Sequence, residues 1–286
     1  MSSRRYDTVS FLSDFGHGSD AVGIIKSILR DLAPDVVVID IAHDITPFDV
    51  RAASLAFARA VPYLPEGIII TSVDPGAGGN RRIIAVEIAG GAGIVIGPDN
   101  GLIATGVALA GGADRAVVLD RDEHHLASPG ATFAARDVMA PVAAALCAGA
   151  DLFAVGTEID AATLLPSVVP IPREENGGLA CEVIWIDRFG NCQLNVSVDD
   201  LSTVWGAVPE RVRVSWGDNV RNLRITTSYA DLGAGALGLV VDSTGLLSLS
   251  LDRASAAREL GIGEGEGVLI SPSDEQGVTV PVTLRA

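Results

Sequence analysis

The chain has 286 residues, of which 48% are hydrophobic and 20% charged, so it can bury a substantial core and is not disordered as a whole. Its formal net charge of −16 argues against nucleic-acid and anionic-membrane partners, because both require clustered Lys and Arg. The three cysteines form no CxxC pair, which argues against a disulfide framework and a thiolate zinc site. No apolar run has the length of a signal segment or a membrane span, so we expect a cytoplasmic protein.

Up to about residue 172, short apolar runs alternate with helical patterns. Runs rich in Val and Ile predict strands at Thr8–Leu12, Val36–Ile41, Gly67–Val73, Arg82–Ile88 and Gly93–Ile96. Helical spacing predicts helices at Asp20–Leu32, with Asp20 as N-cap, and at Ala52–Ala60 and Asp137–Ala148. Strands that alternate with helices indicate an α/β domain, assigned to residues 1–172, with a mainly parallel sheet covered on both faces.

After Pro172 the pattern changes, and the polar segment 173–178 predicts a domain boundary. Strands are predicted beyond it at Leu179–Ile186, Val212–Trp216, Leu223–Thr227, Leu237–Val241, Leu246–Leu251 and Val278–Leu284. Only Arg253–Leu260 has a helical pattern. Residues 178–286 are therefore predicted to form an all-β domain, either a small barrel or a sandwich.

Polar residues follow several predicted strands of the first domain. Asp14 follows the first strand, Asp74 the third, and Asp99 with Asn100 the fifth. Any single Asp before Gly or Pro is most simply explained as turn chemistry. In an open α/β sheet, however, ligands bind outside the carboxyl ends of the strands, so the three together predict a small-molecule site.

Other catalytic patterns are missing. The sequence has no GxSxG elbow or HExxH helix, and the glycines of DPGAGG form neither a GxGxxG fingerprint nor a Walker motif. His43-Asp44 is interpreted as a pair that stabilises a loop, and His124-His125, in a charged stretch, as a solvated loop.

Six motifs together resemble one enzyme family. FLSDFG, IAHDITPFDVRAA, SVDPGAGGNRR, GPDNGLI, TFAARDVMAP and IDRFGNCQLN occur in this order across the chain. The chain is similar to the S-adenosyl-L-methionine (SAM) hydroxide adenosyltransferases, which are SAM hydrolases related to the SAM-dependent fluorinase and chlorinase. This resemblance implies an α/β N-terminal domain, a C-terminal β-barrel and a homotrimer with SAM bound between subunits. It implies no cofactor, since SAM is the substrate and adenosine and methionine are the products.

The resemblance also implies roles for individual side chains in binding SAM. Asp14 matches the carboxylate that binds both ribose hydroxyls, while Phe48 and Phe133 match walls around the ribose and sulfonium. Two further residues match the adenine site, where one stacks and the other hydrogen-bonds: Phe189 and Asn191. Asp187 matches the carboxylate that faces the methionine ammonium, and Ser243 matches a donor to the methionine carboxylate.

The hydrolases of this family carry an Asp-Arg-His triad around the attacking water. Asp74 and Arg81 match its first two members, with Arg82 as the alternative arginine. Where the hydrolases read TFHGRD this chain reads TFAARD, so Ala134 stands at the histidine and Ala135 at the glycine. His124 or His125 is a minor alternative as a substitute.

Three functions remain open from the sequence. The first is hydrolysis of SAM, including its R-sulfonium epimer, by in-line attack of water at the ribose 5′ carbon, with Asp74 accepting the proton. The second is a chlorinase-type halogenase, which Asp74 disfavours because the halogenases carry Tyr there. The third is a SAM- or adenosine-binding protein with little turnover, because Ala134 removes a triad member.

Overall fold

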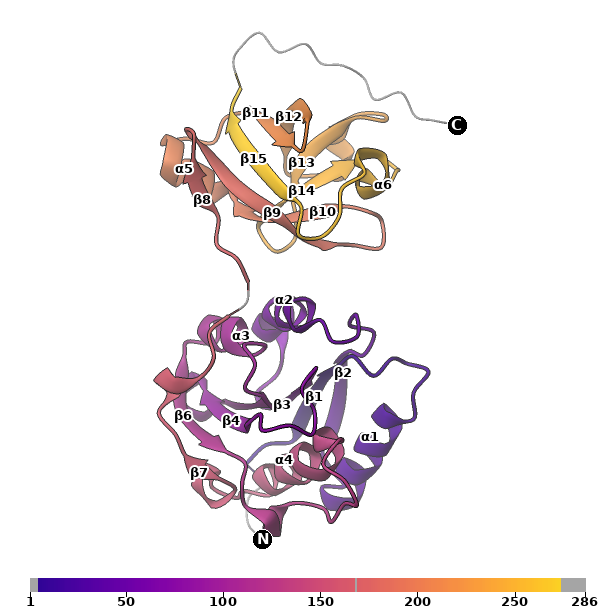
Figure 1. Cartoon of the computed structure of the whole chain (residues 1–286), viewed down its shortest axis with the longest axis vertical. Coiled ribbons are helices and arrows are strands. Elements are labelled where there is room, and N and C mark those ends of the chain that lie inside the picture. Colours follow the sequence, from indigo (N-terminus) through magenta and orange to yellow (C-terminus); the bar gives the residue numbers. More distant parts are fainter. Residues whose placement is uncertain (1–4, 168, 274–286) are drawn as a thin grey trace. The chain divides into compact units, whose positions relative to one another are not determined.

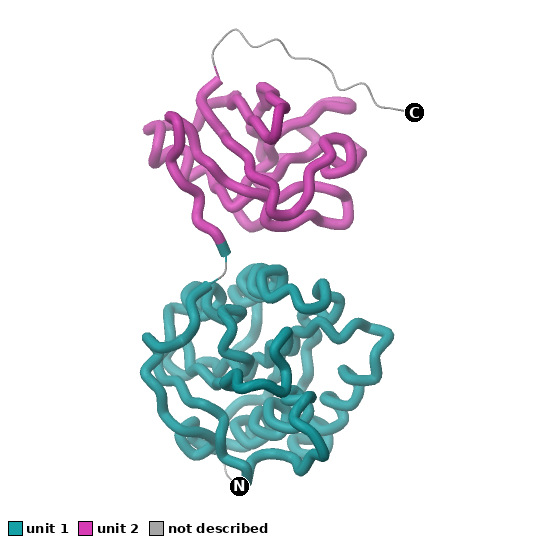
Figure 2. The backbone as a smooth tube through the Cα atoms, in the orientation of Figure 1, with its two compact units in different colours: residues 1–169 teal, residues 170–286 magenta. Residues whose placement is uncertain are grey.

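The computed structural model describes residues 5–167 and 169–273 (Figure 1). The chain divides into two compact units, residues 1–169 and residues 170–286 (Figure 2). None of the described helices is long and apolar enough to cross a membrane.

Unit 1 is built on a seven-stranded sheet in the order β2-β1-β3-β5-β4-β6-β7. Its strands are β1 (Thr8–Ser13), β2 (Val37–Ala42), β3 (Gly67–Ser72), β4 (Ile83–Ile88), β5 (Gly93–Pro98), β6 (Ala113–Val118) and β7 (Thr157–Glu158). The segment β2-β1-β3-β5 is parallel, whereas β4, β6 and β7 extend it with antiparallel pairings. The prediction of a mainly parallel sheet is confirmed, although β6 and β7 were not predicted.

Helices cover both faces of this sheet (Figure 1). They are α1 (Ala21–Leu32), α2 (Val50–Ala60), α3 (Ala104–Leu109) and α4 (Ala140–Cys147), the last preceded by a π-helix at Ala135–Met139. Alternate residues of one strand enter different cores. Ile68 and Ile70 of β3 pack in the core that includes residues of α1 and α4, whereas Ile69 packs in the core that includes residues of α2 and α3. The central strands are therefore apolar at successive positions because both faces are buried.

The helix starts differ in their chemistry. Asp49 caps α2, because its side chain accepts a hydrogen bond from the backbone of Ala52 at 2.8 Å. Asp20 occupies the predicted N-cap of α1, but its side chain makes no capping hydrogen bond there.

Unit 2 is an eight-stranded sheet in the order β10-β14-β13-β12-β11-β15-β9-β8, and an additional β10–β9 pairing closes it into a barrel. Its strands are β8 (Arg173–Glu175), β9 (Gly178–Ile186), β10 (Cys192–Ser197), β11 (Arg211–Trp216), β12 (Asn219–Thr226), β13 (Leu237–Val241), β14 (Leu246–Leu251) and β15 (Gly267–Pro272). One hydrophobic core with residues from β9 to β15 fills this unit. The prediction of a barrel-like β domain is confirmed.

Unit 2 differs from the sequence prediction in several details, and its strands β10 and β15 were not predicted. The polar segment 173–178 forms β8 and the turn into β9 rather than a free linker. A second helix, α5 (Val198–Trp205), was missed, although Ser197 and Asp200 form a capping box at its start. The predicted helix begins later than expected, as α6 (Ala256–Leu260), and the predicted strand Val278–Leu284 lies outside the described residues.

A buried ion cluster supports β4 and β6 of unit 1. Glu87 is 6% exposed and accepts hydrogen bonds from Arg115 Nε at 2.6 Å and from an Arg5 terminal nitrogen at 2.7 Å. The hydrogen bond from Arg115 holds the pKa of Glu87 below its ordinary value, and this effect outweighs the opposing effect of burial.

We expect Glu87→Gln to lower the free energy of unfolding at pH 7 by about 2 kcal/mol, because two guanidinium groups lose their charged acceptor. Since the pKa of Glu87 is lower in the folded state, the stabilisation is complete above the ordinary glutamate pKa of about 4.3 and is lost as the pH falls through the folded-state pKa. Urea unfolding of the wild-type and Glu87→Gln proteins from pH 7 down to about pH 3 measures whether their free energies of unfolding converge. Exposed Glu158→Gln is the control, and a pH-independent difference would contradict the prediction.

Candidate active site

The parallel strands bring the predicted acidic residues to one edge of the sheet. β1, β3 and β5 run in the same direction, and Asp14, Asp74 and Asp99 follow their carboxyl ends. β4 runs antiparallel to β5, so Arg81 and Arg82, which directly precede it, lie at this same edge. The topology therefore places two arginines beside three carboxylates.

Asp74 and Arg81 form an ion pair. Arg81 Nε lies 2.7 Å from Asp74 Oδ1, and the side chains are 30% and 11% exposed, respectively. The N–H of Nε does not point at this oxygen, so the contact is between charges rather than a directed hydrogen bond. The same oxygen accepts a hydrogen bond from Gly76 N at 2.9 Å. A Cβ atom at Gly76 would lie 2.7 Å from an Arg81 terminal nitrogen, so a side chain there would force this guanidinium to shift.

Arg82 serves a different carboxylate. Its Nε donates to Asp99 Oδ2 at 3.0 Å, and a terminal nitrogen donates to the carbonyl oxygen of Thr163 at 3.0 Å. Asp99 also accepts a hydrogen bond from Leu165 N at 2.9 Å. The Asp99–Arg82 pair therefore anchors the segment around residue 164, and Arg81 rather than Arg82 is the arginine that contacts Asp74.

Asp14 is held by a neighbouring loop. Its Oδ2 accepts a hydrogen bond from Phe48 N at 2.9 Å. Phe48 has a left-handed backbone with φ of 69°, and its side chain is 71% exposed. Phe133 is partly buried, and its ring meets the ring of Phe15 edge to face, with centroids 5.6 Å apart. Phe48, which is exposed, and Phe133, which is partly buried, thus lie in loops at the carboxyl edge of the sheet.

The segment that carries Ala134 lies beside the Asp74 loop. A Cβ atom at Gly78 would lie 3.4 Å from Thr132 Cγ2, which shows how closely the two loops pack. Ala134 occupies the N-cap position of the π-helix and presents only a methyl group. His125 Nδ1 lies 3.6 Å from Asp122 Oδ1, a contact within its own loop. No interaction that the structure describes joins His125 to the Asp74–Arg81 pair.

Unit 2 carries a pocket of about 700 Å³. Its lining includes three of the predicted residues and four that the sequence did not single out, namely Asp187, Phe189, Asn191, Tyr229, Arg253, Ser255 and Arg258. Of the four missed residues, Tyr229 lies on the segment after β12, and the others lie on the segment that leads into α6 or in α6 itself. No local motif links such separated positions, so only the fold reveals them.

The loop of residues 187–191 is organised by Asp187. Its Oδ1 accepts hydrogen bonds from the backbone of Phe189 and of Asn191, each at 2.9 Å, and its Oδ2 accepts one from Asn191 Nδ2 at 2.8 Å. Gly190 has a φ of 85°, and a Cβ atom there would lie 2.0 Å from Ser255 Oγ. This packing fixes the loop against the start of α6 and leaves the side chain of Phe189 79% exposed.

Ser243 is an exposed residue of the β13–β14 turn and is not among the residues that line the pocket. Its neighbour Asp242 accepts a hydrogen bond from Gln193 Nε2 at 2.6 Å. Burial raises the pKa of Tyr229, and the negative charges of Asp187 and Asp242 raise it further. The turn that carries Ser243 therefore lies within electrostatic reach of a pocket residue.

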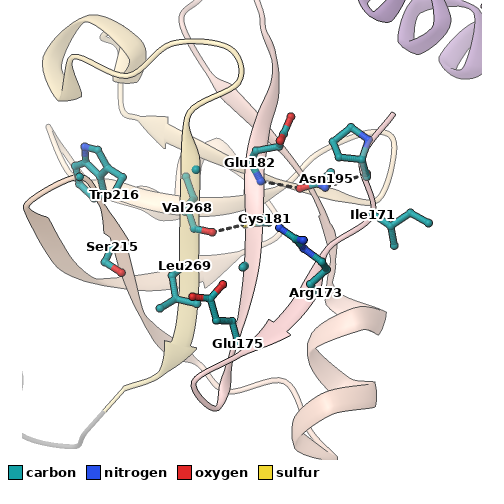
Figure 3. A pocket seen from close by; sticks show the side chains of 14 residues that line it. Ile171, Arg173, Glu175, Cys181, Glu182, Asn195, Ser215, Trp216, Val268 and Leu269 are labelled. Atoms are coloured by element: carbon teal, nitrogen blue, oxygen red, sulfur yellow. Dashed lines mark hydrogen bonds between the residues drawn. The ribbon is translucent and has the colours of Figure 1, made fainter. Parts of the chain in front are cut away.

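A second hollow in unit 2, of about 830 Å³, lies along β8, β9, β11 and β15 (Figure 3). Two of its polar side chains are engaged in hydrogen bonds, whereas the indole nitrogen of Trp216 is buried without a described partner. Asn195 Oδ1 accepts a hydrogen bond from Glu182 N at 2.8 Å, and Asn195 Nδ2 donates to the carbonyl oxygen of Pro170 at 3.0 Å. The Cys181 thiol donates to the carbonyl oxygen of Val268 at 3.2 Å. The pocket around Phe189 differs from this hollow in that its lining contains three of the residues predicted to bind the substrate, Asp187, Phe189 and Asn191.

The remaining candidates for chemistry are structural. Burial raises the pKa of Cys192, beside the 187–191 loop, to about 12, so this thiol packs in the core rather than acting as a nucleophile. Within the described ranges, no group of three or more His, Cys, Asp or Glu side chains could hold a metal ion.

Two family models match the chain in the order of its two units. The SAM hydroxide adenosyltransferase N-terminal domain matches residues 9–156, and the SAM hydroxide adenosyltransferase C-terminal domain matches residues 181–269.

Individual relatives agree with this match. An (R)-S-adenosyl-L-methionine hydrolase from Salinispora tropica is 37% identical over 263 residues, which cover 92% of this chain and 97% of the relative. A fluorinase from Actinopolyspora mzabensis is 28% identical over 299 residues, covering 93% of this chain and 97% of the relative. The crystal structure of an uncharacterised conserved protein from Thermotoga maritima superposes with a TM-score of 0.83 at 28% identity, covering 92% of this chain and 99% of that one. This chain belongs to the SAM hydroxide adenosyltransferase family.

Proposed function

We propose that this protein hydrolyses SAM, in particular its R-sulfonium epimer, to adenosine and L-methionine. The observation that carries the proposal is the Asp74–Arg81 ion pair at the carboxyl edge of the sheet, in a chain similar to an (R)-S-adenosyl-L-methionine hydrolase. The fluorinase relative is less similar, and the halogenase alternative gains no separate support.

The chemistry asks little of the protein beyond position and one proton acceptor. The sulfonium leaves as a neutral thioether, so departure needs no general acid. Water must approach the ribose 5′ carbon in line with the carbon–sulfur bond. In our proposal Asp74 accepts the proton of this water, and Arg81 holds the carboxylate in place. Ala134 provides no third polar group, so water is oriented by this pair alone.

The remaining site residues bind the substrate in this proposal. Asp14 accepts both ribose hydroxyls, a task that suits a group with two acceptor oxygens. Phe48 and Phe133 wall the ribose and sulfonium. Adenine stacks on Phe189, whose ring is 79% exposed and thus accessible to a partner. Asn191 hydrogen-bonds the edge of the adenine.

Two residues recognise the methionine end in this proposal. Asp187 faces the ammonium group through Oδ2, which accepts one hydrogen bond within the loop and retains a further lone pair, whereas Oδ1 already accepts two. Ser243, on the exposed β13–β14 turn, donates to the methionine carboxylate.

We further propose a homotrimer in which unit 1 of one chain and unit 2 of its neighbour contribute to each active site. The exposed aromatic rings of Phe48 and Phe189 support this idea, because each lies in one of the two candidate regions and is large enough to bury against a ligand. We also propose a cytoplasmic enzyme that needs no cofactor. The thiols of Cys147, Cys181 and Cys192 are buried and form no disulfide, which fits a reducing compartment.

The first test is incubation with each SAM epimer in chloride-containing and chloride-free buffer, followed by chromatography with mass detection. We expect adenosine and methionine in both buffers, with ¹⁸O from labelled water in the 5′ hydroxyl of adenosine.

Asp74→Asn should lower kcat by about a hundredfold, because the water loses its proton acceptor. The exposed Asp122→Asn is the matched control. A chlorinated deoxyadenosine would identify a halogenase, and tight binding of intact SAM would identify a binding protein.

A second test restores the missing histidine. We expect Ala134→His to raise kcat by about tenfold or more, because a second acceptor then orients the attacking water. Steady-state kinetics at saturating SAM measure the gain. Ala131→His, in the same exposed segment, controls for a histidine added near the site. An unchanged kcat in a folded Ala134→His protein would show that position 134 does not face the water.

A third test concerns the shared site. We expect Asp74→Ala and Phe189→Ala to be nearly inactive alone and to regain activity when they are unfolded together and refolded as a mixture. Recovery follows because a mixed trimer contains sites in which both residues are intact. Sedimentation velocity gives the oligomeric state of the same samples. A monomeric protein, or a mixture without any gain, would count against the shared site.

A further inference from the structure

A continuous hydrogen-bond chain runs into unit 1 beside the proposed ribose carboxylate. His43 Nδ1 lies 2.8 Å from Ser13 Oγ, and His43 Nε2 lies 3.1 Å from Asp40 Oδ1. Asp40 Oδ2 accepts a hydrogen bond from Lys26 Nζ at 2.6 Å. The side chain of His43 is fully buried, as is Ser13. These four residues are called the His43 chain below.

For the neutral ring of His43, its partners fix the direction of each hydrogen bond. An ionised carboxylate only accepts, so Asp40 accepts a hydrogen bond from His43 Nε2, and Nδ1 is then the acceptor. Burial alone would raise the pKa of Asp40, but the hydrogen bonds from Lys26 and His43 bring it below its ordinary value. Ser13 therefore donates its hydroxyl proton to Nδ1, and its oxygen can accept from Phe15 N at 3.4 Å.

The loops on either side of this chain are joined at three further points. Gly16 N donates to the carbonyl oxygen of His43 at 2.7 Å, and His17 N donates to Asp44 Oδ1 at 3.1 Å. Phe48 N donates to Asp14 Oδ2 at 2.9 Å. The two loops, residues 13–17 and 43–48, are thus joined along their length.

Simple packing does not account for this arrangement. The ring of His43 does pack against Phe11, with centroids 4.7 Å apart, and a purely apolar ring would serve that contact equally well. The polar contacts, in contrast, converge on Ser13 and Phe15, the residues directly before and after Asp14. These polar contacts orient the backbone on both sides of Asp14, which packing of the His43 ring alone would not do.

We propose that the His43 chain is a positioning device that holds the Asp14 carboxylate where two adjacent ribose hydroxyls can bind it. The inference rests on the proposed function, which gives Asp14 the ribose. His43 and Ser13 do not touch the substrate in this account. They act through the backbone on both sides of Asp14, so that the carboxylate is fixed before the ligand arrives.

The test compares adenosine with 2′,3′-dideoxyadenosine, which lacks both hydroxyls, in calorimetric titrations of the full-length protein. We expect the wild-type protein to bind adenosine more tightly than dideoxyadenosine. Ser13→Ala should lower this ratio of affinities by about tenfold, because the Asp14 carboxylate is no longer held in position. The affinity for dideoxyadenosine itself should stay nearly constant. His43→Asn should retain most of the preference, because its side-chain amide can still reach Ser13, whereas His43→Phe should not.

Ser54→Ala is the matched control, because Ser54 is fully buried in the same unit and its hydroxyl has no described hydrogen-bond partner. In an Asp14→Ala background, Ser13→Ala should have no further effect on the preference. Thermal unfolding verifies that each variant is folded. A folded Ser13→Ala protein with the wild-type preference would overturn the proposal. If the wild-type protein itself does not distinguish the two nucleosides, the assignment of Asp14 to the ribose fails first.

Discussion

The central constraint on unit 1 is that β1, β3 and β5 are buried on both faces. Their sequences contain no ionisable residue, because a charge on either face would lie in a hydrophobic core without water. Charged groups must therefore follow the strands, and the parallel direction gathers them at one edge. The Asp74–Arg81 and Asp99–Arg82 pairs both arise from this constraint, since antiparallel β4 begins where β3 and β5 end. The candidate chemistry is thus a consequence of how the sheet is covered.

Much of this arrangement could be predicted from the sequence. Apolar runs of Val and Ile identified the central strands because burial on both faces excludes charged residues. β6 was missed because it carries Asp114 and Arg115 near a more exposed edge. β10 was missed because Gln193 and Asn195 are buried and satisfied by distant partners, which no local pattern announces. Buried polar side chains are stable when they form hydrogen bonds, and here the partners are distant in the sequence. Such strands therefore lack the apolar pattern on which the prediction depends.

The candidate site shows the same division. The acidic residues at strand ends could be predicted because turn position and sheet direction together determine where they lie. The choice of Arg81 over Arg82 rested on motif spacing alone, and in the structure Arg81 contacts Asp74 whereas Arg82 pairs with Asp99. His43 was predicted to stabilise a loop with Asp44. In the structure His43 hydrogen-bonds to Ser13 and Asp40, while Asp44 pairs with His17. Each residue thus contacts partners other than its neighbour in the sequence.

The left-handed backbone of Phe48 has a consequence for how this protein could change over time. A bulky side chain at a φ of 69° costs about 1 kcal/mol of folding free energy compared with glycine at the same position. A change to glycine would remove that cost while leaving the N–H that meets Asp14, so selection for stability alone would favour losing the ring. The aromatic side chain is 71% exposed and contributes little to the core. The fold therefore carries local backbone strain at an exposed ring directly beside the Asp14 carboxylate.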